Sequence, residues 1–180
     1  MSEENGGAVG GEVKKLAHDV LAPLDSQLGF VERFAPLDIA KSKAEGIPLV
    51  GIFTAWAAME SNFAESGLAK ASNNLFGIKA GPTWIKEGKP YVTFRTREYE
   101  GTPNEVTITS NFRKYSSWTA SLDDLIKELT TDFKTGGALQ ALQRGDVGGF
   151  LSGIEASGYS TAANYGQRIE NFMQQIAHIA

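Results

Sequence analysis

Residues 46–63 read GIPLVGIFTAWAAMESNF, and this stretch predicts a strong helix that begins just after its proline. Gly and Pro end the preceding helical pattern, and Pro suits a first helical turn because its missing N–H has no partner there. Apolar residues then recur at spacings of four and three, at Leu49, Phe53 and Trp56, and a further step of four reaches Glu60. A carboxylate therefore ends the apolar stripe of this helix.

Outside this helix the pattern is mostly helical and is interrupted once by the alternation typical of strands. The segment Gly81–Pro90 is broken by Gly and Pro, and the residues after it change from a period of 3.6 to a period of two. Tyr91–Tyr99 and Val106–Tyr115 are rich in Thr, Val, Phe and Tyr, and turn residues separate them, so we predict a β-hairpin. Ser116 or Ser117 can cap the helix that follows.

The predicted fold class is α+β, mainly α, with the hairpin inserted as a second lobe, and clefts between lobes are common ligand sites. The predicted helices lie at about Glu12–Glu45, punctuated by Pro23 and Pro36, and at Leu49–Phe63, Trp118–Phe133, Ala138–Arg144, Val147–Ala156 and Ala162–His178.

Composition narrows the class of function. The chain has 180 residues, which fits one domain, and a net charge of −4 without a long Lys/Arg run, so nucleic acid is not expected as a partner. Cysteine is absent, which excludes disulfides, a thiol nucleophile and cysteine-bound zinc. The two histidines, His18 and His178, lie near opposite ends of the chain. We therefore predict neither a metal site nor a cofactor.

The N-terminal residues predict how the chain is organised and where it is made. Residues 1–11 are Gly-rich and acidic, so we predict a flexible segment there and one domain over residues 12–180. A basic segment followed by an apolar run is not seen, so no signal peptide is predicted. The longest mainly apolar stretch, Ile47–Met59, is shorter than the roughly 20 residues that span a bilayer. We expect a protein made in the cytoplasm, with no membrane partner.

Two carboxylates are candidates for catalysis. Glu60 has apolar neighbours, Met59 and Phe63, so burial should raise its pKa and keep it protonated, as donation to a departing sugar oxygen requires. Glu98 shares the more apolar face of the first strand with Phe94, and glycosidases use a second carboxylate as base or nucleophile. The alternatives are a solvated residue at a helix end for Glu60 and a surface ion pair for Glu98.

Two polar segments are candidates for substrate binding. Ser72–Lys79 is a polar turn that runs into an apolar segment. If Asn74 lies on the wall of the cleft, its amide could form hydrogen bonds with an N-acetyl group or a hydroxyl of the ligand. Gly158–Thr161 joins two predicted helices, and loops on a rigid scaffold often carry function, which makes Tyr159 a candidate. Plain turn chemistry for Asn74 and core packing for Tyr159 are the alternatives.

These segments together resemble the signature of glycoside hydrolase family 73, the endo-β-N-acetylglucosaminidases. Five matches occur in the family order, and the string Asn-Asn-Leu-Phe-Gly-Ile-Lys is specific. The matching segments are Phe53–Ser61, Ser66–Lys79, Thr96–Tyr99, Phe112–Trp118 with Ser121-Leu122, and Gly158–Thr161 with Asn164-Tyr165.

The resemblance implies a lysozyme-like fold and hydrolysis of the β-1,4 bond between N-acetylglucosamine and N-acetylmuramic acid in peptidoglycan. It also implies that Glu60 is the general acid, Glu98 the second carboxylate and Tyr159 a tyrosine of the active site. Substrate contacts are expected at four residues within the matching motifs, namely Asn74, Phe76, Tyr99 and Tyr165. The chain departs from the family after the acid, where Asn62-Phe63-Ala64 replaces the usual Gly-Trp-Gly.

Three alternatives keep the same fold: a lytic transglycosylase, a non-catalytic glycan-binding module and a phage lysin. Because the chain carries no recognisable assembly domain or wall-binding repeat, we favour an antibacterial effector delivered into the periplasm of a target bacterium. Such an effector would require a cognate immunity protein in the producing cell.

Overall fold

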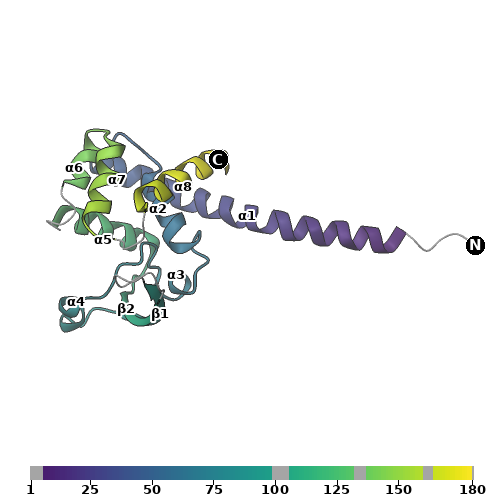
Figure 1. Ribbon diagram of the computed structural model, residues 1–180, viewed down its shortest axis with the longest axis horizontal. Coiled ribbons are helices and arrows are strands. Elements are labelled where there is room, and N and C mark those ends of the chain that lie inside the picture. The colour runs from purple at the N-terminus through teal and green to yellow at the C-terminus, as the bar shows by residue number, and fades with distance from the viewer. Residues whose placement is uncertain (1–5, 99–105, 132–136, 160–163, 180) are drawn as a thin grey trace, which may run out of the picture.

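A computed structural model of the chain describes residues 6–98, 106–131, 137–159 and 164–179. The predicted class is confirmed, because the chain is mainly helical with a two-stranded sheet (Figure 1). In chain order the elements are α1 (Gly6–Ala44), α2 (Ile52–Ser61), α3 (Gly67–Ser72), α4 (Pro82–Lys86), β1 (Tyr91–Glu98), β2 (Val106–Arg113), α5 (Trp118–Thr131), α6 (Ala138–Gln143), α7 (Val147–Ala156) and α8 (Tyr165–Ile179).

Helix α2 lies in the core of the protein. Every residue from Ile52 to Met59 is buried, as expected for a helix that is apolar on all sides. It packs against α1 and α8, and the Trp56 ring contacts Phe76 and Phe150 edge to face, with centroids 6.0 and 5.6 Å apart. The central helix therefore holds a fixed position, and Glu60 lies in its last turn.

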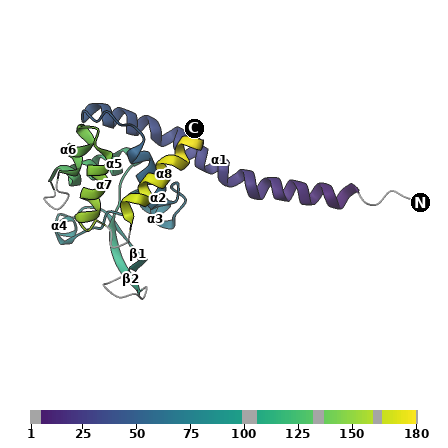
Figure 2. The same ribbon diagram turned by 45° about the horizontal axis from the view of Figure 1, so that its top comes forward.

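The hairpin extends from the helical body (Figure 2). Strands β1 and β2 pair antiparallel from Tyr91 opposite Arg113 to Glu98 opposite Val106. The predicted alternation is confirmed over the first residues of β1, where Val92 and Phe94 are half-buried and the intervening side chains are exposed. At the base of the hairpin, the Ala80 N–H donates to the Asn111 carbonyl at 2.8 Å, which attaches the preceding loop to β2.

Helix α1 differs from the prediction at its start and at its prolines. It begins at Gly6 rather than near Glu12, and it continues through Pro23 and Pro36 without a break. A proline inside a helix costs about 3 kcal/mol. Pro36 lies in the part of α1 that contributes to the core, from Phe30 onward, so tertiary packing offsets the cost there. Its N-terminal part projects away from the body (Figures 1 and 2). The flexibility of residues 1–11 stays a prediction.

Two short helices, α3 and α4, were not predicted. Helix α3 is capped by the Ser66 hydroxyl, which accepts from the Ala69 N–H at 3.2 Å. Helix α4 begins at Pro82, within the Gly81–Pro90 segment that contains several Gly and Pro residues. Helices this short show only a weak period. The predicted cap of α5 is confirmed at Ser117, whose hydroxyl accepts from the Ala120 N–H at 3.1 Å.

Candidate active site

Glu60 is the penultimate residue of α2, at the end of the predicted apolar stripe. Its side chain is exposed to solvent, although the neighbouring Met59 and Phe63 are buried. Gly77 lies beside it, since a Cβ atom built on that glycine would be 3.6 Å from Glu60 Oε2. The carboxyl group is thus accessible to a ligand while protein surrounds it on several sides.

A chain of two hydrogen bonds ends on Glu60. Trp56 Nε1 donates to the Tyr165 hydroxyl at 2.6 Å, and that hydroxyl donates to Glu60 Oε1, also at 2.6 Å. Because an indole N–H can only donate, the tyrosine oxygen is an acceptor toward Trp56 and directs its own proton to the carboxylate. Trp56 and Tyr165 are both buried, so the α2 and α8 helices together hold one carboxylate oxygen in place.

Burial raises the pKa of Glu60 above its ordinary value, because removal from water disfavours the ionised carboxylate. The hydrogen bond from Tyr165 and the positive charge of Arg168 lower the pKa, but they offset the effect of burial only in part. The direction predicted from the apolar neighbours is therefore confirmed. A carboxyl group of this kind keeps its proton to a higher pH than an exposed glutamate and can donate it to a leaving group.

Tyr159 lies beside the same cluster, as predicted for a residue near the candidate acid. Its ring centroid is 5.0 Å from that of Trp56 and 6.1 Å from that of Tyr165, and its hydroxyl donates to the Phe76 carbonyl at 3.0 Å. Burial raises its pKa well above the ordinary value, and the nearby Glu60 carboxylate adds to the effect. Tyr159 is therefore neutral at physiological pH and can act as a hydrogen-bond donor.

Asn74 is 1% exposed and its amide binds backbone groups at the base of the hairpin. It donates to the carbonyls of Ile78 and Arg113, both at 2.9 Å, and accepts from the Ile78 N–H at 3.1 Å. Phe76 is equally buried, and its ring packs against Phe34 and Trp56 in the core. These contacts give both residues a structural role, and a direct contact of either side chain with substrate stays a prediction.

The role of Glu98 as second carboxylate stays a prediction. Glu98 ends β1 opposite Val106, and the placement of its side chain lies outside the described residues, as does all of Tyr99. Tyr165, predicted to contact substrate, is buried and bonded to Glu60. Its position therefore supports a role in holding the acid, while the expected substrate contact stays a prediction.

Asp38 supports the site and was missed by the sequence analysis. It is fully buried on α1 and accepts from the Thr54 N–H at 2.8 Å, the Thr54 hydroxyl at 2.7 Å and the Ser42 hydroxyl at 3.0 Å. The N-cap position of α2 is Gly51, which has no side chain to cap the helix, so Asp38 supplies the acceptor from another helix. A pattern typical of caps could not reveal it, because its partner is 16 residues away.

The part of the chain that the structure describes holds no group of three or more His, Cys, Asp or Glu side chains able to bind a metal ion. Among the same residues, no helix combines the length and the hydropathy needed to cross a membrane.

A mainly helical body, an inserted hairpin and a desolvated but accessible carboxyl group at the end of the central helix define a lysozyme-like glycoside hydrolase domain. The family model Glucosaminidase, described as mannosyl-glycoprotein endo-beta-N-acetylglucosaminidase, matches residues 35–178. The chain belongs to this family of glycoside hydrolases, which confirms the resemblance found in the sequence.

Relatives and solved structures agree with this assignment. Peptidoglycan hydrolase FlgJ of Vibrio parahaemolyticus is 32% identical over 169 residues, covering 92% of this chain and 52% of that protein. The catalytic domain of the autolysin Auto from Listeria monocytogenes has a TM-score of 0.63 at 26% identity, over 84% of this chain and 85% of that one. A chain of a type VI secretion system effector–immunity complex from Pseudomonas protegens shares the fold, with a TM-score of 0.56 at 18% identity over 86% and 93%. The chain spans about half the length of the first curated relatives it matches.

Proposed function

We propose that the chain hydrolyses the β-1,4 bond between N-acetylglucosamine and N-acetylmuramic acid in peptidoglycan, with Glu60 as the general acid. The observation that carries this proposal is a carboxyl group whose pKa is raised by burial and whose side chain is nevertheless exposed to a ligand. Membership of the glucosaminidase family and similarity to a peptidoglycan hydrolase support it.

The geometry suggests how the acid works. Tyr165 binds Glu60 Oε1, which leaves Oε2 on the side of Gly77 to carry the proton toward the sugar oxygen. As the glycosidic bond breaks, that proton moves to the departing oxygen and Glu60 becomes a carboxylate. The hydrogen bond from Tyr165 stabilises the carboxylate at that moment, because a donor favours the charged form of its acceptor. We expect Tyr159 to orient substrate through its hydroxyl oxygen as an acceptor, because its one proton is donated to the Phe76 carbonyl.

The identity of the bond that is cleaved is tested by the products. Hydrolysis as proposed leaves reducing ends on N-acetylglucosamine, which mass spectrometry of reduced products can identify. Reducing ends on N-acetylmuramic acid would instead make the chain a muramidase, and anhydro sugars would make it a lytic transglycosylase. A turbidity assay on purified peptidoglycan detects the release of soluble fragments. Binding of the wall without such release would indicate a glycan-binding module.

Glu98 is proposed as the second carboxylate. It could activate water or attack the sugar, but the acetamido group of the substrate offers another nucleophile, so we expect Glu98→Gln to lose less activity than Glu60→Gln. Both variants are to be compared on the same purified peptidoglycan after equal folding has been verified. Equal inactivity would make Glu98 an essential base or nucleophile, and full activity in Glu98→Gln would remove it from the mechanism.

The biological setting is a separate proposal: a delivered antibacterial effector acting in the periplasm of a target cell and neutralised by an immunity protein. The shared fold with a chain of an effector–immunity complex is compatible with that role. Expression of the chain with and without an added secretion leader provides the test. We expect lysis only when the chain reaches the periplasm. Rescue by a protein encoded by a neighbouring gene would identify the immunity partner, and a neighbouring holin gene would favour a phage lysin.

A further inference from the structure

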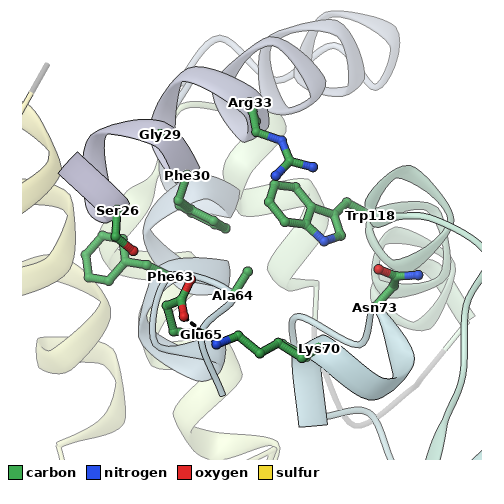
Figure 3. A pocket seen from close by; sticks show the side chains of 11 residues that line it. Ser26, Gly29, Phe30, Arg33, Phe63, Ala64, Glu65, Lys70, Asn73 and Trp118 are labelled. Atoms are coloured by element: carbon green, nitrogen blue, oxygen red, sulfur yellow. Dashed lines mark hydrogen bonds and ion pairs between the residues drawn. The ribbon is translucent and has the colours of Figure 1, made fainter. Parts of the chain in front are cut away.

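A pocket separate from the carboxyl group of Glu60 lies between α1, α3, the start of α5 and the loop after α2 (Figure 3). Its volume is about 480 Å³, which is in the range of small-molecule sites. Phe30 and Phe63 form its apolar wall, and Trp118 forms another side. Glu60 does not line it, so its chemistry differs from that of the candidate active site.

The pocket carries one net positive charge. Lys70 pairs with Glu65, which leaves the guanidinium of Arg33 as the uncompensated charge. Among the described residues no carboxylate pairs with Arg33, whose Cζ atom lies 4.3 Å from the centroid of the Trp118 ring (Figure 3). A guanidinium stacked on an aromatic ring keeps the N–H groups of its edge available, and these match the two oxygens of a carboxylate.

The pocket wall is continuous with the segment that follows the acid. Asn62, Phe63 and Ala64 have φ values of 50°, 55° and 65°, a run of left-handed conformations that costs about 1–2 kcal/mol for each residue other than glycine. The Ser61 hydroxyl accepts from the Ala64 N–H at 2.8 Å and helps to hold this turn. The strained backbone aims Phe63 and Ala64 at the pocket instead of continuing the helix, and it lies where the family usually has Gly-Trp-Gly.

We propose that this pocket binds the carboxylate of a peptide stem of peptidoglycan, with Arg33 as the residue that recognises it. The inference rests on the proposed function, because the stem is carried by the glycan strand that the enzyme cleaves. Phe63 follows Glu60 by three residues, so their Cα atoms lie within about 11 Å, and an extended stem of four residues spans about 13 Å. An extended stem is thus longer than the separation of these two Cα atoms, which is the basis for expecting a stem on a sugar bound near Glu60 to reach the pocket.

Calorimetry on the Glu60→Gln protein tests the proposal, because this variant should bind the probes without cleaving them. The probes are a purified disaccharide that carries a tetrapeptide stem and the same disaccharide without the stem. Adding Arg33→Gln should weaken binding of the stem-bearing probe about tenfold, the loss expected for one charge-assisted hydrogen bond, and leave the other probe unchanged. The matched control is Arg144→Gln, an exposed arginine beyond the end of α6, which should change neither affinity.

A second measurement keeps this proposal separate from the proposed function. With Glu60 intact, Arg33→Gln should hydrolyse glycan stripped of its stems at the wild-type rate and stem-bearing glycan more slowly. An unchanged affinity for the stem-bearing probe, or an equal loss for both probes, would overturn stem recognition even if both glycans are cleaved. If the wild-type chain cleaves neither glycan, the proposed hydrolysis fails, while the calorimetric comparison still decides whether Arg33 binds the stem.

Discussion

Asp38 and Glu60 both have pKa values raised by burial. Asp38 binds the first turn of α2 from another helix, whereas Glu60 belongs to the last turn of α2, and their surroundings differ. Asp38 is fully buried and accepts three hydrogen bonds from two residues, so its oxygens are committed to the fold. Glu60 is exposed to solvent and accepts one described hydrogen bond, from Tyr165. A raised pKa alone therefore does not identify a catalytic acid. Access to a ligand and an oxygen without a fixed partner separate the two carboxyl groups.

The largest effect is expected from Glu60→Gln. The amide has nearly the same shape but cannot donate the proton, so lytic activity should fall by about 10²-fold or more. Thermal unfolding should show a folded protein, because Glu60 contributes little to the packing of α2. Activity within a few-fold of wild type, in a protein that melts normally, would remove Glu60 from the role of general acid.

Asp38→Ala should act on stability. The buried Thr54 N–H loses its acceptor, which costs about 2 kcal/mol, or roughly a 30-fold change in the folding equilibrium. Chemical denaturation measures this change, and Asp25→Ala, an exposed acid on the same helix, provides the control. Activity per folded molecule should fall far less than in Glu60→Gln. A loss as large as that of the acid, without destabilisation, would contradict the distinction between the two carboxyl groups.

Tyr165→Phe should alter the pH dependence of catalysis. The tyrosine hydroxyl stabilises the carboxylate form of Glu60, so its removal should raise the pKa of Glu60 further. Because the acid must be protonated, the alkaline limb of the kcat/KM profile should move to higher pH. Poorer positioning of the acid should also lower the rate by about tenfold or less, which is below the usual contribution of a general acid. Tyr91→Phe, at an exposed site on the hairpin, is the control. A limb that stays in place or moves to lower pH would show that this hydrogen bond does not set the pKa.

The smallest effect concerns stability as a function of pH. The folded-state pKa of Glu60 lies above its ordinary value of 4.5, so the native state holds the proton more tightly than the unfolded chain does. Its favourable contribution is complete below that ordinary value and is lost as pH rises through the folded-state pKa. Relative to wild type, Glu60→Gln should therefore gain stability between pH 4 and pH 8. Denaturation at both values measures the difference, and a relative loss at pH 8 would reverse the sign.

The sequence predicted the elements whose patterns are local and long. Helix α7 begins and ends where predicted, and α2 lies within the predicted range. Strand β1 follows the prediction as far as Glu98, beyond which the residues are not described, and β2 ends two residues before the predicted Tyr115. Glu60 was predicted as the acid because its spacing on α2 and the family motif agree, and that role stays a proposal. Continuity of α1 through Pro36 was not foreseen, since tertiary packing overrides a local signal there.

The contacts that position the site could not be predicted in the same way. Tyr165 is 105 residues from Glu60 in sequence, so only the packing of α8 against α2 brings the two together. Asn74 belongs to a motif that suggested substrate binding, while its hydrogen bond to the Arg113 carbonyl depends on the folded hairpin. The pocket around Arg33 combines residues from four separate segments, and no periodicity in the sequence relates them.

The hydrogen-bond chain from Trp56 to Glu60 gives the protein an intrinsic spectroscopic reporter. The indole N–H of Trp56 is separated by one hydroxyl from the carboxyl group whose protonation state governs the proposed chemistry. A change of charge on Glu60 alters the polarity of the Tyr165 hydroxyl and, through it, the shielding of the indole proton and nitrogen. In a spectrum of the ¹⁵N-labelled protein, the Trp56 resonance should therefore titrate with Glu60, which allows the acid to be followed in the intact enzyme without a substrate or an attached probe.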